Sequence, residues 1–212
     1  MLRLVIGSKT YSSWSLRPWL LLREGGVEFE EVRIPFTGAW RDEVRRLSPS
    51  GRVPVLQDGE LVIWDSLAIC EYAAEQHPEL AGWPADARRR AQARAVAAEM
   101  HSGFVALRTE LPQNLRVHGR AAPDALSASC RADVARIEAL WSSCLRESGG
   151  PWLFGSFGIA DAMYAPVALR FTSYGVALGA EAEAYRARVD ALPSVRAWTR
   201  DALAEPEREP AA

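Results

Sequence analysis

The sequence predicts an α/β domain followed by an all-helical domain. Up to about residue 80, short apolar runs typical of strands alternate with helical segments, and no strand pattern follows residue 64. Residues 78–87 hold two prolines and a glycine, the composition of a linker, which we place at 79–86. We therefore expect an α/β domain at 1–78 and a helical domain at 87–212.

The predicted elements of the first half follow the order β-α-β-α-β-β-α. Gly25 and Gly26 stop the first helix, and the Asp58-Gly59 turn marks a hairpin. The predicted elements are a strand at Leu2–Ile6, a helix at Ser15–Arg23, a strand at Val27–Ile34, a short helix or turn at Trp40–Leu47, a hairpin of Val53–Leu56 and Leu61–Trp64, and a helix from Asp65 or Ser66 to about Gln76.

The second half shows only helical patterns. Pro112 stops the first of these helices, and Pro166 falls inside the third and is expected to bend it. The predicted helices run from Asp86 to about Leu111, from about Pro123 or Asp124 to Arg146, from Ile159 to about Phe171, from Tyr185 to Ala191 and from Ser194 to Leu203.

Composition excludes several kinds of function. The 212 residues are 49% hydrophobic and 25% charged, which is ordinary for a globular protein, and the net charge of -2 gives no reason to expect a nucleic-acid partner. No apolar run approaches the roughly 20 residues of a membrane span, and no signal peptide is recognisable. Three cysteines at no metal-like spacing indicate no metal site and a reduced, cytoplasmic setting.

Three serines crowd the start of the first predicted helix, within the stretch Tyr11–Trp19. Ser12, Ser13 and Ser15 can cap free N–H groups of the first turn, and Pro18 fits a position where no intrahelical donor is lost. A helix start with spare donors also suits an anion. Capping alone and anion binding are both open readings of these serines.

Three further features accompany this stretch. Pro54 begins a strand just after the turn in Ser50–Leu56, Trp64-Asp65-Ser66 opens a helix, and Phe157–Asp161 precedes an apolar helix. Together with the order of elements, these features resemble the cytosolic glutathione transferases, in which a thioredoxin-like domain joins a helical domain. The serine stretch is similar to the serine-type, zeta-like group that includes maleylacetoacetate isomerase and bacterial relatives, except that Trp14 stands where many members carry cysteine.

The resemblance implies that glutathione is a co-substrate and that the anion is its thiolate. A hydroxyl that donates to the sulfur, together with the positive end of a helix, would lower the thiol pKa. The resemblance puts Ser12 first for this role and Ser13 second, with Ser15 as a supporting cap. Without a cysteine in the loop, sulfur chemistry by the protein itself is not expected.

The resemblance also assigns the rest of the glutathione site. Val53–Pro54 is expected to be a cis peptide that lets the Val53 backbone pair with the cysteinyl unit. Ser66 would hold the γ-glutamyl carboxylate and Asp65 the α-amino group, while plain N-capping is the alternative. Arg52 would pair with the glycyl carboxylate or be a solvated loop charge.

The second substrate is expected to meet the helix that begins at Asp86. At helical spacing, Ala97, His101, Phe104 and Arg108 share one face, which with Trp14 would border the electrophile. The alternatives are an ordinary interhelical His101 and a structural or surface Arg108. Asp161 is expected to be a structural helix cap.

Three functions are consistent with the sequence. The first is a glutathione transferase acting on a small electrophile, the second is a glutathione-dependent cis-trans isomerase of a maleylacetoacetate-like acid, and the third is a non-catalytic binding module of the same fold. The resemblance implies a homodimer, with no nucleic-acid or membrane partner and no metal.

Overall fold

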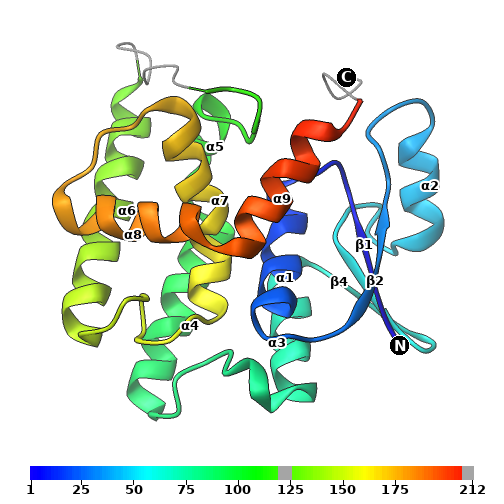
Figure 1. The fold of residues 1–212 in the computed structure, drawn as a ribbon, viewed down its shortest axis with the longest axis horizontal. Helices are drawn as coiled ribbons and strands as arrows, with labels where there is room; N and C mark the ends of the chain where they lie inside the picture. Colours follow the sequence, from blue (N-terminus) through cyan, green and yellow to red (C-terminus); the bar gives the residue numbers. More distant parts are fainter. Residues whose placement is uncertain (119–125, 207–212) are drawn as a thin grey trace.

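The computed structural model describes residues 1–118 and 126–206, and its first half is built on a four-stranded mixed sheet (Figure 1). The strand order is β2-β1-β3-β4, with β1 parallel to β2 and antiparallel to β3. β3 and β4 form the predicted hairpin. The strands are β1 (Leu2–Ile6), β2 (Phe29–Arg33), β3 (Val55–Asp58) and β4 (Leu61–Trp64).

Helices cover both faces of this sheet. Alternate residues of β1 point to opposite faces, so Leu4 and Ile6 join the main core whereas Val5 packs with Val44 of α2 in a small second core. The helices are α1 (Ser13–Glu24) and α3 (Ser66–Gln76) on the side of the main core and α2 (Trp40–Leu47) on the other. The predicted thioredoxin-like layout is thereby confirmed.

The second half is helical, as predicted. In the part of the chain that the structure describes, only two isolated bridges near residue 154 follow β4. The helices are α4 (Ala87–Ser102), α5 (Val105–Glu110), α6 (Ala128–Ser148), α7 (Ile159–Tyr174), α8 (Ala180–Ala191) and α9 (Pro193–Ala204), preceded by the short 3-10 helix η1 (Pro78–Leu80). Helix α7 is buried along almost its whole length and packs against α1, α4 and α8, so one hydrophobic core joins both halves (Figure 1).

The predicted helix from Asp86 to Leu111 is wrong in one respect, because it breaks after Ser102 and restarts at Val105. Phe104 adopts a left-handed backbone conformation with φ 58°, which no continuous helix permits. A Cβ on Gly103 would lie 2.7 Å from the Glu99 carbonyl oxygen. The glycine therefore reflects this sharp break.

Other boundaries differ by a few residues. Helix α6 begins at Ala128 with Ser127 as its cap, and the predicted starts at Pro123 and Asp124 lie outside the described residues. Helix α7 continues past Phe171 to Tyr174 with Pro166 in its interior, and α8 begins at Ala180 rather than Tyr185.

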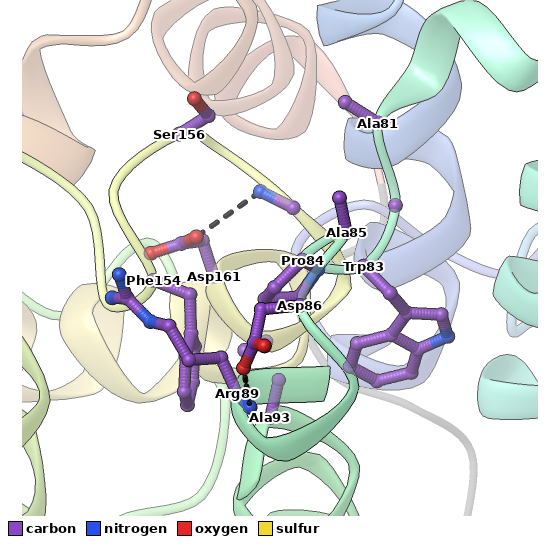
Figure 2. A pocket seen from close by; sticks show the side chains of 13 residues that line it. Ala81, Trp83, Pro84, Ala85, Asp86, Arg89, Ala93, Phe154, Ser156 and Asp161 are labelled. Atoms are coloured by element: carbon purple, nitrogen blue, oxygen red, sulfur yellow. Dashed lines mark hydrogen bonds between the residues drawn. The ribbon is translucent and has the colours of Figure 1, made fainter. Parts of the chain in front are cut away.

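Asp161 caps the start of α7 by accepting from Gly158 N (Figure 2), and both of its carboxylate oxygens accept hydrogen bonds. The side chain is 1% exposed and accepts hydrogen bonds from Leu153 N at 3.1 Å, Tyr185 Oη at 3.0 Å and Gly158 N at 3.1 Å. Burial raises its pKa to about 7, although the three donors act in the opposite direction. These contacts support the structural role expected for this residue.

Gly158 occupies the N-cap position of α7 because the segment that joins the two halves, residues 79–86, passes close to it. A Cβ there would lie 2.9 Å from the Gly82 carbonyl oxygen, and the same oxygen accepts from Ile159 N at 3.0 Å. The linker and the start of α7 border a cavity of ≈ 500 Å³ (Figure 2). The close approach leaves no room for a side chain at position 158. Asp161 therefore accepts from the Gly158 backbone, but no side chain at position 158 caps the helix in return.

The end of α9 is tied to the loop that precedes the serine stretch. The Glu205 carboxylate, 8% exposed as a residue, accepts from Ser8 Oγ and Lys9 N, each at 2.6 Å, and from Thr10 N at 3.2 Å. It also pairs with Arg33 at 3.3 Å. A single carboxylate thus satisfies donors from the loop and from β2.

Lys9 reinforces the same junction. Its Nζ atom lies 2.8 Å from Glu31 and 2.9 Å from Asp201, and about equally far from the rings of Trp19 and Trp198, at 5.2 and 5.3 Å. The side chain is buried, so its charge is compensated by two carboxylates and two aromatic faces.

Asp161→Ala is expected to lower the free energy of unfolding by about 3 kcal/mol, because three buried donors lose their acceptor. That corresponds to a fall in melting temperature of roughly 6–12 °C. Asp86→Ala is the matched control, since this exposed N-cap of α4 accepts one backbone bond, from Arg89 N at 2.9 Å. Its expected cost is about 1 kcal/mol, and an equal melting temperature for the two variants would contradict the assignment.

Glu205→Gln is expected to destabilise the protein by about 2 kcal/mol, because one amide oxygen replaces two carboxylate acceptors among buried donors. Urea denaturation measures this difference. Glu75→Gln, an exposed position on α3, is the control with the same chemical change. If the two variants unfold at the same urea concentration, the junction contributes nothing to stability.

Candidate active site

A cleft of ≈ 500 Å³ opens between the serine stretch, the loop before β3, the start of α3 and the end of α4. Its lining contains seven of the side chains predicted from the sequence. The lining residues are Trp14, Ser50, Arg52, Val53, Pro54, Trp64, Asp65, Ser66 and His101. The structure therefore brings the expected glutathione residues together with one residue of the helical half.

The serines at the start of α1 are buried and partly satisfy one another. Ser12 is the N-cap: its Oγ accepts from Ser15 N at 3.3 Å and donates to Ser15 Oγ at 2.7 Å. Ser15 Oγ also accepts from Gly7 N at 3.1 Å, which ties the helix start to the end of β1. Ser13 Oγ accepts from Arg170 Nη2 at 3.1 Å. None of the three serines lines the cleft itself, where Trp14 represents this stretch.

The Val53–Pro54 peptide bond is cis, as predicted. Val53 lies just outside the ladders of the sheet, whose nearest registered pairs are Val55–Trp64 and Val5–Val55. Val53 borders the cleft just before the first rung of β3. This position would allow an extended peptide ligand to add to the sheet.

The start of α3 also faces the cleft. Asp65 caps the helix by accepting from Leu67 N at 2.9 Å and Ala68 N at 3.3 Å, and its backbone has a positive φ of 76°. Ser66 is the first helical residue, and its Oγ accepts from Arg17 Nη1 at 3.4 Å. A helix N-terminus with a hydroxyl and a neighbouring guanidinium has the chemistry of a carboxylate site. Arg52 lies exposed at the rim.

His101 comes from the last turn of α4 and reaches across to the start of α3. Its Nε2 atom lies 3.2 Å from Asp65 Oδ2, and its ring meets the Trp14 ring edge-on at 5.2 Å. Partial burial lowers the pKa of His101, and the positive charges of Arg17 and Arg108 act in the same direction, while Asp65 opposes them.

The expected shared face of four residues is not present, because the helix breaks at Gly103. Phe104 lies in the core, with its ring 6.5 Å from that of Tyr164, and it does not line the cleft. Arg108 folds back onto the end of α4, where Nη2 donates to the carbonyl oxygens of Met100 and His101, the latter at 3.0 Å. Its guanidinium still reaches the site region, 4.8 Å from the Trp14 ring.

Two buried arginines beside the serine stretch escaped the sequence analysis. Arg17 on α1 is 1% exposed and lies 4.1 Å from the Trp14 ring, and Arg170 on α7 is 5% exposed. Burial lowers the pKa of Arg17 to about 9 and that of Arg170 to about 10. The available signal was a single charged residue inside an apolar helical run, as in Leu16–Leu22 and Ala162–Phe171.

Among residues 1–118 and 126–206, no helix is long and apolar enough to cross a membrane. Within the same ranges, no group of three or more His, Cys, Asp or Glu side chains could hold a metal ion.

Asp65→Asn is expected to lower the pKa of His101 further, because the opposing negative charge of Asp65 beside its ring is removed. The imidazole is then deprotonated at a lower pH than in the wild type. A proton NMR titration measures this change, with His77 as an internal reference that contacts Glu79 instead. An unchanged or raised pKa of His101 would contradict the contact with Asp65.

Comparison with known proteins places the cleft in a family context. Residues 11–76 match the family model of the glutathione S-transferase N-terminal domain, and residues 86–201 match that of the C-terminal domain. A glutathione S-transferase from Rhodospirillum rubrum superposes with a TM-score of 0.72 at 26% identity, over 100% of this chain and 96% of the other.

Curated relatives match over shorter stretches. Glutathione S-transferase 1 of Zea mays is 44% identical over 72 residues, which are 32% of this chain and 34% of the relative. A probable maleylacetoacetate isomerase of Caenorhabditis elegans is 34% identical over 92 residues, 43% of this chain and 42% of the relative. The aligned parts thus span less than half of these relatives. The family models nevertheless match most of the chain in both halves, and the chain therefore belongs to the glutathione S-transferase family.

Proposed function

We propose that the protein is a glutathione transferase that stabilises the glutathione thiolate at the start of α1 for attack on a small electrophile. The observation that supports this proposal most directly is that one cleft is lined by Val53, by the capped start of α3 and by Trp14 of the serine stretch. In this proposal residues 1–78 hold glutathione, 79–86 form a linker and 87–212 supply the electrophile pocket.

Each part of glutathione has a matching group in the cleft. The γ-glutamyl carboxylate would meet Ser66 and the N–H groups of the first turn of α3. The α-amino group would meet Asp65, whose second carboxylate oxygen lies near His101. The cysteinyl backbone would pair with Val53, and the glycyl carboxylate would meet Arg52.

The thiolate requires a donor and a positive field. A free thiol has a pKa of about 8.5, and lowering it by ~2 units needs ~2.7 kcal/mol of preferential binding to the anion. A hydroxyl donor and the N-terminus of α1 can supply energy of that order.

Ser12 and Ser13 are the candidate donors, with Ser15 as support. Ser12 donates its hydroxyl proton to Ser15 Oγ, so it must rotate to reach a sulfur. Ser13 Oγ accepts from Arg170, which leaves its own proton free to donate and polarises the hydroxyl. The resemblance favours Ser12 and this hydrogen-bond arrangement favours Ser13, so both are tested below.

A second candidate is glutathione-dependent cis-trans isomerisation of a maleylacetoacetate-like acid. His101 in the cleft and Arg108 beside Trp14 favour an acidic substrate, and the relative from C. elegans is named a probable maleylacetoacetate isomerase. Both reactions would use the same thiolate site. A non-catalytic binding module is the third candidate and predicts poor glutathione binding.

The family commonly forms homodimers, and we propose a cytoplasmic homodimer here. Glutathione and a small electrophile would be its ligands, and the proposal needs no metal, nucleic acid or membrane.

Ser12→Ala or Ser13→Ala is expected to lower kcat/KM about 100-fold, which matches a loss of ~2.7 kcal/mol of thiolate stabilisation. In the affected variant the pKa of bound glutathione rises toward its free value, as followed by the ultraviolet absorbance of the thiolate. Ser129→Ala, exposed on α6, is the control and should behave as wild type.

Calorimetry with glutathione, followed by a panel of aromatic halides, maleylacetoacetate-like acids and peroxides, tests the proposal as a whole. Failure of the wild type to bind glutathione at millimolar concentration would exclude a transferase. Glutathione binding without any effect of either serine substitution would exclude the serine mechanism.

A further inference from the structure

Three arginines from separate helices gather around Trp14. Arg17 of α1 and Arg108 of α5 both lie against its ring, at 4.1 and 4.8 Å from the ring centre. Arg170 of α7 joins them through its hydrogen bond to the neighbouring Ser13. We call Arg17, Arg108 and Arg170 the arginine cluster.

The arginine cluster has no paired anion. Within residues 1–118 and 126–206 no carboxylate lies at ion-pair distance from any of its guanidinium groups, which donate to hydroxyl and carbonyl oxygens. Two acids act on the cluster from a distance, Asp65 on Arg17 and Asp133 on Arg108. Both are engaged elsewhere: Asp65 caps α3 and contacts His101, and Asp133 accepts from Leu107 N at 3.0 Å.

The charges therefore act on one another. Burial lowers the pKa of Arg17 and Arg170, and each is lowered further by Arg108. The Nε atoms of all three arginines are buried and have no hydrogen-bond partner among the described residues. Buried cations without a directly paired anion are costly, so a bound anion would be favoured here.

The three members differ in access. Arg17 and Arg170 are nearly inaccessible, whereas Arg108 is half-buried. Arg108 can therefore touch a ligand, while the other two add positive potential from behind it. A planar guanidinium matches the two oxygens of a carboxylate.

We propose that the arginine cluster binds a carboxylate of the second substrate, with Arg108 as the contacting group, so that the preferred electrophile is an organic acid. This inference rests on the proposed transferase function. Arg108 and Arg170 come from the helical half, beside Trp14 and Ser13. The γ-glutamyl carboxylate is expected instead at Ser66 and the start of α3, which among the cluster members only Arg17 contacts. The cluster thus provides a second carboxylate site, next to the expected position of the sulfur.

A chloronitrobenzoate and its methyl ester form a matched pair of probes. In both reactions the glutathione sulfur bonds to the ring carbon, chloride leaves with the electrons of the broken bond, and the thiol proton passes to the buffer. The ester is intrinsically more reactive, so the absolute rates of the two probes cannot be compared directly. The quantity compared between the wild type and each variant is the ratio of kcat/KM for the acid to kcat/KM for the ester.

Arg108→Gln is expected to lower kcat/KM for the acid about 10- to 100-fold, the effect of losing a hydrogen bond to a charged group, and to leave the ester unaffected. Arg170→Gln keeps a donor for Ser13 and should show a smaller loss of the same kind. Arg196→Gln removes one charge from the exposed surface of α9 and is the control, with the wild-type ratio. Equal losses for acid and ester in Arg108→Gln would overturn the proposal.

Glutathione affinity separates the two possible sources of the carboxylate. Calorimetry should give the same Kd for glutathione in wild type and Arg108→Gln. A fall in that affinity with an unchanged acid-to-ester ratio would mean that the cluster holds glutathione instead, and the proposal would be wrong.

Inhibition measured on the wild type tests the carboxylate site without depending on whether a variant folds. Benzoate should inhibit conjugation of the acid more strongly than benzamide, and equal inhibition would contradict a carboxylate site. If glutathione does not bind at all, the transferase proposal fails separately. Calorimetric binding of benzoate to the wild type, with much weaker binding to Arg108→Gln, would then still support the anion site, and no binding would overturn it.

Discussion

Helix α1 is buried on two sides, against the sheet and against α7, and this burial constrains every polar group in its first turn. A buried donor or acceptor without a partner costs about 1–3 kcal/mol, which favours partners for these groups inside the protein. Ser15 is satisfied by the end of β1, Arg17 in part by Ser66 of α3, and Ser13 by Arg170 of α7. The geometry of the candidate site is therefore fixed jointly by the sheet and by the helical half.

Much of the fold could be predicted because its signals are local. The Asp58-Gly59 turn, the paired glycines after the first helix and the apolar run at Leu2–Ile6 each act over a few residues. The resemblance added the cis Val53–Pro54 bond, which composition alone does not reveal. It also indicated most of the residues that line the cleft, since these lie within two short stretches, 50–54 and 64–66.

The remaining parts depend on contacts between distant segments. The face predicted for the helix from Asp86 assumed unbroken helical spacing, but Phe104 adopts a left-handed conformation, which redirects α5. Arg170 meets Ser13 across 157 positions of the sequence, and no local pattern reports such a meeting. Glycine is unfavourable inside a helix, and the structure explains Gly103 by the break at this position.

The junction between Glu205 and the loop before the serine stretch also affects the order in which the chain can fold during synthesis. The hydrogen bond from Lys9 N to Glu205 spans 196 positions. Translation delivers the α/β half first, at about 5–20 residues per second, while its partner on α9 is still to be made. The loop that leads into the candidate active site therefore receives its last support only after Glu205 has left the ribosome. Contacts of such long range slow folding, so completion of this site is expected to be a late step in the biogenesis of the protein.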